Sequence, residues 1–215
     1  MRPDRITIEG RYITLEPLNP AKHTEALWQG LGGESNKDNK SLWLYMPDGP
    51  FMDRAAFDAH MQAKAISEDP LFFAIVDPQT NVAVGRATLM RIDPPNRVIE
   101  VGGIIYTHAL QRSRGATEAM YLLARYVFDE LGYRRYEWKC NSLNEPSRRA
   151  ALRLGFSFEG IFRQHMIIKG KNRDTAWFSM LDSEWPARKR EFERWLDESN
   201  FDSAGNQKTG LNQNA

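Results

Sequence analysis

Two short segments of the chain combine residue types that bind phosphate and handle protons. The first, QRSRGA at residues 111–116, places arginines and a glycine just before a run with helical periodicity. The second, NEPSRRAALRLGF at residues 144–156, begins with Asn144 and carries Ser147 one turn later. Helix starts present unpaired backbone N–H groups and a partial positive charge, and therefore attract phosphate. Together the segments predict a site for a phosphate-bearing ligand, with a reactive group held between two helix starts.

Each segment also has a simpler interpretation. Arg112 and Arg114 can pair with phosphate oxygens, or they can belong to a solvated basic turn that precedes a helix. Asn144 and Ser147 can face a ligand, or they can be an N-cap and an exposed first-turn serine. The order and proximity of the two segments favour the functional interpretation.

Hydrophobic patterning predicts a mixed α/β chain around these segments. Three strand-like runs, LFFAIVD, VAVGRATLMRI and VIEVGGIIY, are separated by turn-forming residues and predict an antiparallel meander. In the third run, Gly102 and Gly103 weaken strand pairing and predict a bulge or a close backbone approach, where a cofactor can lie against the splayed strand. The pattern also predicts a strand or short hairpin at 6–18, a strand over 133–141 and a closing hairpin over 156–181. It predicts helices from Asn19, from Asp53 to about 67, and over 116–131, 144–154 and 183–196.

Composition narrows the function classes. The 215 residues suit one domain, and a formal net charge of +1 gives no support to a nucleic-acid or membrane-surface role. The single cysteine, Cys140, excludes an internal disulfide framework, and the four histidines show no metal-ligand spacing. Residues 1–10 lack the apolar run of a signal peptide, and no run of about 18 apolar residues occurs. We therefore expect a cytoplasmic protein with no metal.

The C-terminal residues have a different composition from the rest of the chain. Residues 202–215 contain almost no apolar side chains, so burial cannot offset the entropy lost on ordering. We therefore expect a domain over residues 1–198 and a flexible tail over residues 199–215.

At this point the chain resembles the GNAT superfamily of acetyl-CoA-dependent N-acetyltransferases, most closely its ribosomal-protein N-acetyltransferase-like branch. The resemblance covers roughly residues 6–185 and is densest in QRSRGATEA, in NEPSRRAALRLGF with FEGIFR, and in RDTAWFSMLDSEW. It implies a single α/β (α+β) domain with a central, mostly antiparallel, splayed sheet and helices on both faces. Its implied co-substrate is acetyl-CoA.

The resemblance assigns cofactor roles to both segments. In the family, the first segment wraps the pyrophosphate of coenzyme A, which here implies Gln111, Arg112, Ser113, Arg114, Gly115 and Ala116. This sequence departs from the family pattern, because Arg114 occupies the first glycine position and Gly115 the variable one. Asn144 resembles the asparagine that holds the pantetheine arm. Ser147 resembles the hydroxyl that protonates the leaving thiolate.

The implied reaction is direct attack of an amine on the acetyl thioester. A base must deprotonate an ammonium with a pKa of roughly 8 to 10, and a backbone N–H at the bulge can hold the thioester carbonyl. Glu100 is our candidate base, although it can also be a solvent-facing strand residue. Tyr106 and Glu137 are weaker candidates. A lone strand cysteine such as Cys140 is more typical of packing than of acyl transfer.

The sequence leaves the acceptor and the partners open. Trp43 and Tyr45 either line the acceptor pocket, which the resemblance slightly favours, or belong to the core. The acceptor is either a small-molecule amine or a protein N-terminus. A homodimer is left open, and the competing class is a non-catalytic acyl-CoA-binding module.

Overall fold

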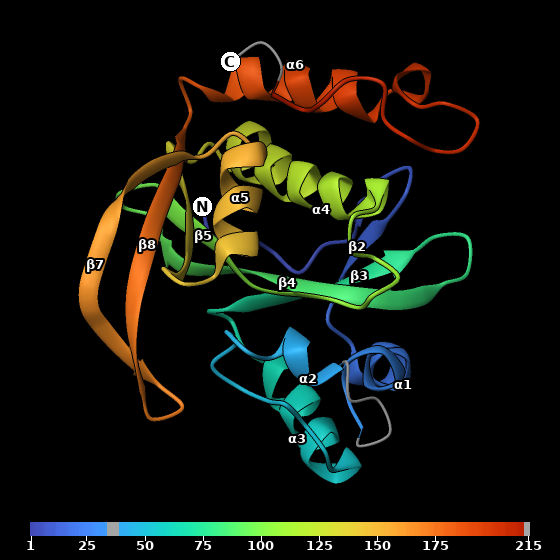
Figure 1. Cartoon of the computed structure of the whole chain (residues 1–215), viewed down its shortest axis with the longest axis vertical. Helices are drawn as coiled ribbons and strands as arrows, with labels where there is room; N and C mark the ends of the chain where they lie inside the picture. The colour runs from blue at the N-terminus through green and yellow to red at the C-terminus, as the bar shows by residue number, and fades with distance from the viewer. Residues whose placement is uncertain (34–38, 213–215) are drawn as a thin grey trace.

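The computed structural model describes residues 1–33 and 39–212 of the chain. In this part, one eight-stranded sheet runs in the order β1-β2-β3-β4-β5-β6-β8-β7 (Figure 1). All neighbouring strands pair antiparallel except β5 and β6, which are parallel. The strand bounds are β1 Ile8–Glu9, β2 Thr14–Pro17, β3 Leu71–Asp77, β4 Val82–Asp93, β5 Val98–Tyr106, β6 Arg135–Asn141, β7 Ser157–Ile168 and β8 Lys171–Leu181. The predicted mixed α/β architecture with a mostly antiparallel sheet is confirmed.

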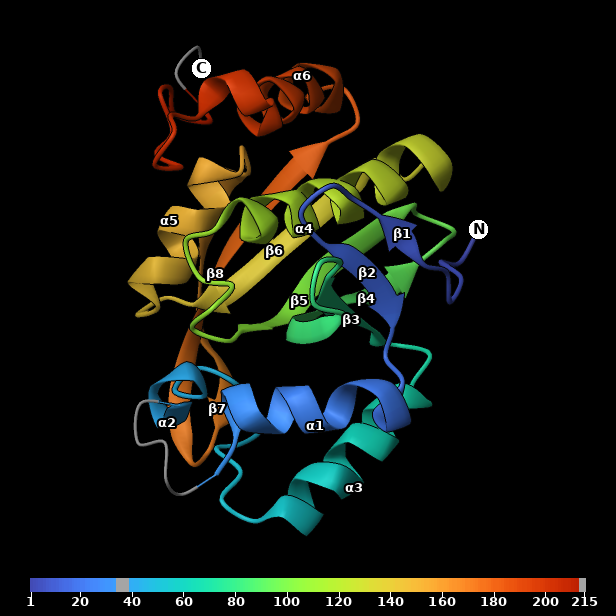
Figure 2. The same ribbon diagram turned by 90° about the vertical axis from the view of Figure 1, so that its right-hand side faces the viewer.

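Helices cover both faces of the sheet, as predicted. The short α2 and the helices α1 and α3 lie on one face, whereas α4 and α6 lie on the other (Figures 1 and 2). In the described ranges, the buried hydrophobic residues form two clusters, one on each face of the sheet. Successive side chains of a strand point to opposite faces, so Phe73 of β3 packs in the cluster with α4, and Phe72 packs in the cluster with α1 and α3. The helix bounds are α1 Pro20–Leu31, α2 Asn39–Leu42, α3 Arg54–Ala65, α4 Arg114–Arg125, α5 Glu145–Arg153 and α6 Trp185–Leu196.

Polar side chains set the starts of the helices. Asn19, Asp53 and Asn144 accept hydrogen bonds from first-turn backbone N–H groups, as their sequence context predicts. The helix predicted to begin at residue 116 instead begins at Arg114, because Ser113 Oγ accepts the N–H of Ala116 at 3.1 Å. This helix continues from α4 into a π-helical turn over residues Tyr126–Glu130.

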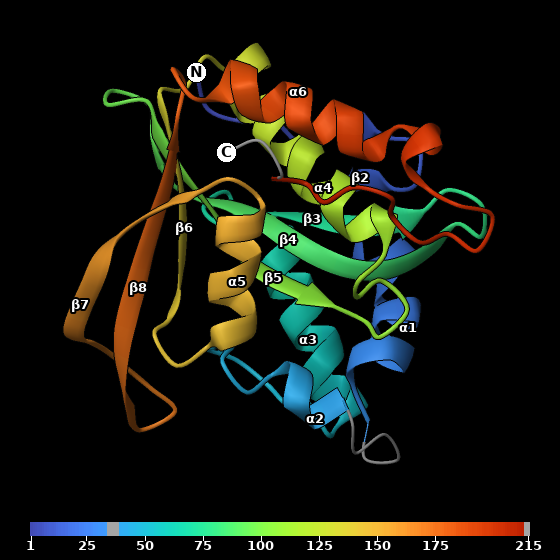
Figure 3. The same ribbon diagram turned by 45° about the horizontal axis from the view of Figure 1, so that its top comes forward.

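Strands β5 and β6 pair at one end and part at the other. Their register runs from Val98 opposite Arg135 to Val101 opposite Trp138, and it ends there. In β5 the predicted bulge is confirmed, since the register with β4 shifts next to Gly103, whose φ is +57°. A side chain at Gly103 would also meet Thr88 at 3.0 Å. The sheet therefore splays at the bulge, and α5 lies beside this opening (Figure 3).

The C-terminal segment, residues 201–212, packs against the rest of the domain. Leu211 is 2% exposed and belongs to the same core cluster as Phe201. Asn212 Nδ2 donates to the carbonyl oxygens of Leu152 and Arg153 at 2.9 and 2.7 Å, at the end of α5. The expectation that this segment supplies no core residue is wrong, because a single leucine and side-chain hydrogen bonds suffice to anchor it. Its mobility stays a prediction, and residues 213–215 lie outside the described part.

Within the described ranges, the structure has no helix long and apolar enough to span a bilayer.

Candidate active site

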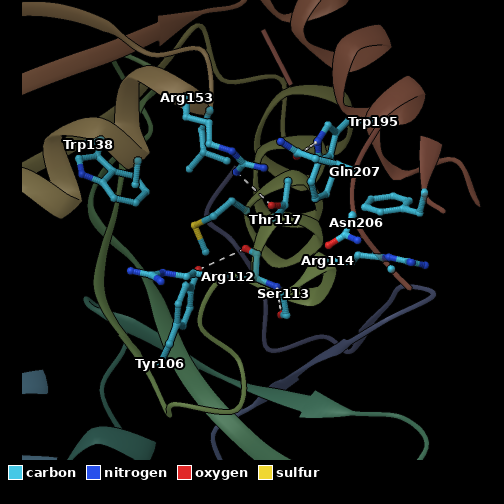
Figure 4. Close-up of a pocket in the computed structure, with 16 residues that line it drawn as sticks. Tyr106, Arg112, Ser113, Arg114, Thr117, Trp138, Arg153, Trp195, Asn206 and Gln207 are labelled. Atoms are coloured by element: carbon cyan, nitrogen blue, oxygen red, sulfur yellow. Dashed lines mark hydrogen bonds between the residues drawn. The ribbon is translucent and has the colours of Figure 1, made fainter. Parts of the chain in front are cut away.

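A cavity of about 740 Å³ opens between the parted strands. Tyr106 lines it from the end of β5 and Trp138 from β6 (Figure 4). The start of α4, the end of α5, Trp195 of α6 and the C-terminal segment supply the remaining walls. A cavity of this size is typical of small-molecule and cofactor sites.

The cavity wall is positively charged. Arg112, Arg114 and Arg153 line it, and none of the lining residues that the structure describes is acidic. Arg153 donates to Thr117 Oγ1 at 3.1 Å, as Figure 4 shows. Burial lowers the pKa of Arg153 from its usual 12.5, but an arginine remains charged in proteins. Guanidinium groups near a helix start, where backbone N–H groups also converge, form a site suited to phosphate.

The structure separates the predicted phosphate-loop residues into two groups. Arg112, Ser113, Arg114 and Ala116 line the cavity. Gln111 and Gly115 do not. Gln111 Nε2 instead donates to the carbonyl of Tyr106 at 3.5 Å. A side chain at Gly115 would lie 2.7 Å from Ile13, so this glycine permits close packing of α4 against the N-terminal segment.

A buried carboxylate fixes the position of α4. Glu118 accepts the backbone N–H groups of Arg11, Tyr12 and Ile13 at 2.9, 2.6 and 2.9 Å. A side chain at Gly10 would collide with the same carboxylate at 2.6 Å. These contacts tie α4, which carries Arg114, to the turn between β1 and β2.

Ser147 and Asn144 lie together at the start of α5. Asn144 Oδ1 accepts the N–H of Ser147 at 3.2 Å, so the N-cap interpretation of Asn144 is confirmed. Asn144 is not among the residues that line the cavity. Ser147 Oγ accepts the indole N–H of Trp138 at 3.0 Å and also contacts Cys140, whose thiol has its pKa raised by burial. Ser147 is thus held against the cavity wall, and its role as an acid stays a prediction.

Glu100 lies in a charged network on the other face of the sheet. It is 5% exposed, so the solvent-facing alternative is wrong. Burial raises the pKa of the Glu100 carboxyl, although the nearby Lys139 Nζ, at 2.9 Å, opposes this shift. A side chain at Gly102 would lie 3.4 Å from Glu100 Oε1. The carboxylate therefore lies beside the bulge and has a pKa shifted toward that of a base at neutral pH.

The two weaker base candidates have different environments. Burial by itself raises the pKa of Glu137, but hydrogen bonds from Lys139 and Arg135 outweigh it and hold that pKa below its usual range. Burial raises the pKa of Tyr106 well above 10, so its hydroxyl stays protonated and donates to the carbonyl of Ala116 at 3.4 Å. Tyr106 therefore suits a proton donor better than a base.

The predicted acceptor-side aromatics also differ from each other. Trp43 is 1% exposed in the second core cluster, and its indole N–H donates to the carbonyl of Leu31 at 2.8 Å. It presents no open ring face to an acceptor. Tyr45 is half-buried and donates to the carbonyl of Leu143 at 3.0 Å, in the turn just before α5. Of the two, Tyr45 lies near the start of α5.

Sequence patterns missed several cavity residues. Arg153 belongs to α5 and lies one turn after Ala150, which also lines the cavity, and this spacing is the signal that could have identified it. Asn206 and Gln207 come from the segment predicted to be a tail, and no local pattern indicates their position. Among the described residues, no group of three His, Cys, Asp or Glu side chains could hold a metal ion.

A sheet that splays at a bulge, with an arginine-lined cavity at the opening, is an arrangement suited to an anionic ligand. The family profile described as the acetyltransferase (GNAT) domain matches residues 13–157. The chain therefore belongs to the GNAT family. The predicted family resemblance is confirmed.

Related structures agree along nearly the whole chain. A GCN5-related N-acetyltransferase from Brucella melitensis is 52% identical, with a TM-score of 0.95, and the alignment covers 98% of this chain and 94% of that one. A GNAT-family protein from Chromobacterium violaceum is 36% identical with a TM-score of 0.79, covering 86% and 91% of the two chains. YdaF of Bacillus subtilis, provisionally named a ribosomal N-acetyltransferase, is 31% identical over 105 residues, which are 49% of this chain and 57% of YdaF. The match thus spans little more than half of that relative.

Proposed function

We propose that this protein transfers the acetyl group of acetyl-CoA to a primary amine by direct attack. The observation that carries this proposal is the arginine-lined cavity, which begins where β5 and β6 part and ends at the start of α4. The arginines that line the cavity suit the phosphates of coenzyme A. The end of the cavity where β5 and β6 part suits the thioester. Membership of the GNAT family supports the same chemistry.

Glu100 is the proposed base. Its carboxylate lies beside the bulge, on the face opposite the cavity. An acceptor amine that approaches from this face would meet the thioester across the opening. Glu100 then accepts the proton of the ammonium, directly or through water, and the amine nitrogen forms the new bond to the carbonyl carbon.

The thiolate must gain a proton as it leaves. Ser147 is the proposed acid, because its hydroxyl is fixed by Trp138 at the cavity wall. Backbone N–H groups at the bulge can hold the thioester carbonyl, since β5 has no β6 partner beyond Val101. The reaction releases the acetylated amine and free coenzyme A.

We propose a protein N-terminus as the first acceptor class to test, because the relative YdaF carries a ribosomal N-acetyltransferase name. Small amines form the second class. The experiment mixes the protein and acetyl-CoA with N-terminal peptides, free amino acids and polyamines, measures thiol release, and confirms the product by mass. Turnover with one class identifies the acceptor type. Tight acetyl-CoA binding without thiol release across the whole panel would instead indicate a non-catalytic acyl-CoA-binding module.

A further inference from the structure

The C-terminal segment forms one end of the cofactor cavity. Phe201, Gly205, Asn206 and Gln207 all line it, next to Trp195 of α6. Figure 4 shows Trp195, Asn206 and Gln207 on one side of the cavity, with Trp138 and Tyr106 on the other. A ligand whose reactive end lies near Trp138 would thus have its far end at this segment.

Several contacts hold the segment in this position. Gln207 Oε1 accepts the indole N–H of Trp195 at 2.8 Å, and Phe201 and Gln207 pair as an isolated β-bridge. Arg194 donates to Thr209 Oγ1 at 2.6 Å and to the carbonyl of Gly210 at 2.8 Å. These contacts favour the position in which the segment forms the wall, and such preorganisation lowers the entropic cost of binding a ligand against it.

Phe201 also positions a charge at this end. The Arg114 guanidinium lies 3.8 Å from the centre of the Phe201 ring and 5.6 Å from that of Tyr12. No carboxylate of the described residues forms an ion pair with Arg114, so its charge is not neutralised. A guanidinium stacked in this way keeps its N–H donors free for a phosphate in its plane.

Two carboxamides complete the wall with unused hydrogen-bonding groups. Asn206 Nδ2 donates to Asp202 Oδ2 at 3.1 Å, and its oxygen has no donor among the described residues. Gln207 uses its oxygen for Trp195, and its Nε2 has no acceptor in the same part of the chain. A free acceptor and a free donor on two consecutive cavity-lining residues match the edge of a nucleobase, which presents both kinds of group.

We propose that residues 201–207 form a nucleotide subsite of the cofactor cavity. Arg114, positioned by Phe201, binds a phosphate, and Asn206 and Gln207 hydrogen-bond the base of a nucleotide-bearing thioester. This inference rests on the proposed use of acetyl-CoA. It adds a recognition element built from a C-terminal segment that lies outside residues 13–157, the part matched by the GNAT profile.

The test compares two probes that share a thiol arm but differ in the nucleotide: coenzyme A and pantetheine. The variant is Asn206→Ala with Gln207→Ala. The matched control is Lys208→Ala, since Lys208 directly follows the proposed subsite, is exposed, and does not line the cavity. Calorimetric titration should show coenzyme A binding weakened about 5- to 50-fold in the double variant, as expected for two lost hydrogen bonds. Pantetheine binding should stay within about 2-fold of wild type, as should both ligands in the control.

A second variant covers the risk that the double substitution perturbs the segment. Asn206→Asp keeps the side-chain shape but adds a negative charge, so it should weaken coenzyme A binding and spare pantetheine. Equal losses for both probes, unchanged coenzyme A affinity, or tighter binding in the variants would each overturn the subsite. Because binding is measured without turnover, a protein that binds coenzyme A through this wall but acetylates no amine would contradict the proposed reaction alone.

Discussion

The indole N–H of Trp138 donates to the Ser147 hydroxyl oxygen at 3.0 Å and so joins the cavity wall on β6 to the start of α5. The serine oxygen accepts this hydrogen bond with one lone pair, so the hydroxyl proton remains available to be donated to another group. Cys140 lies within reach of the same hydroxyl. Trp138, which lines the cavity, therefore orients the Ser147 hydroxyl. A serine that served only as a first-turn residue of the helix would not need this contact.

Ser147→Ala tests whether this hydroxyl protonates the leaving thiolate. We expect kcat to fall about 10- to 10³-fold, with acetyl-CoA binding little changed, since an acid acts on the chemical step. Arg149→Ala is the control, because Arg149 lies on the same helix, is exposed, and neither lines the cavity nor contacts Ser147. Steady-state kinetics and thermal unfolding compare the two variants. Normal turnover in Ser147→Ala would make Ser147 structural and direct attention to Tyr106.

Glu100→Gln tests the base. We expect kcat/KM to fall about 10²- to 10⁴-fold, because the amide cannot accept the proton. In the wild type, burial raises the pKa of Glu100, so activity should fall with decreasing pH along a limb whose midpoint lies above 4.5, the ordinary value. Glu137→Gln is the matched control, since the pKa of Glu137 is lowered. The pH–rate profile separates the two: if Glu137→Gln removes the limb and Glu100→Gln keeps it, the assignment is reversed.

His60 should make stability depend on acidity. Burial, followed by the nearby Arg86 guanidinium, lowers the pKa of His60 from 6.5 to about 4. Between these values the unfolded chain binds the proton and the folded chain does not, so stability is complete above about pH 6.5 and falls as the pH approaches 4. The contribution is up to about 3 kcal/mol.

Chemical unfolding of wild type and His60→Gln across this pH range measures that contribution. Glutamine can still accept the hydrogen bond that Arg86 Nη1 makes to His60 Nε2 at 2.9 Å, but it does not titrate. The variant should therefore lose less stability on acidification. His23, whose pKa is also lowered by burial, keeps part of the pH dependence in both proteins. Identical pH dependence in wild type and variant would show that His60 titrates normally in the folded state.

The sequence by itself determined features that depend on a few neighbouring residues. Asn19, Asp53 and Asn144 cap helices because a short side-chain acceptor reaches the first-turn N–H groups wherever the chain folds. The paired glycines 102 and 103 indicated the bulge, because glycine adopts the positive φ observed at Gly103 without the steric cost that a side chain adds. Order along the chain indicated a ligand site at two helix starts; the cavity does meet the start of α4, but it meets α5 near its end.

Tertiary structure decided which side chains share a site and which are buried. Glu100 is buried because β6 pairs beside β5 and brings Lys139 against its carboxylate from 39 positions away. Arg153 of α5 and Gln207 of the C-terminal segment line the same cavity. Leu211 packs in a hydrophobic cluster whose other members come mostly from much earlier in the sequence. Composition did not indicate that Leu211 is buried. The free energy of ordering depends on the surface that receives a side chain, whereas periodicity and composition describe only the side chain itself.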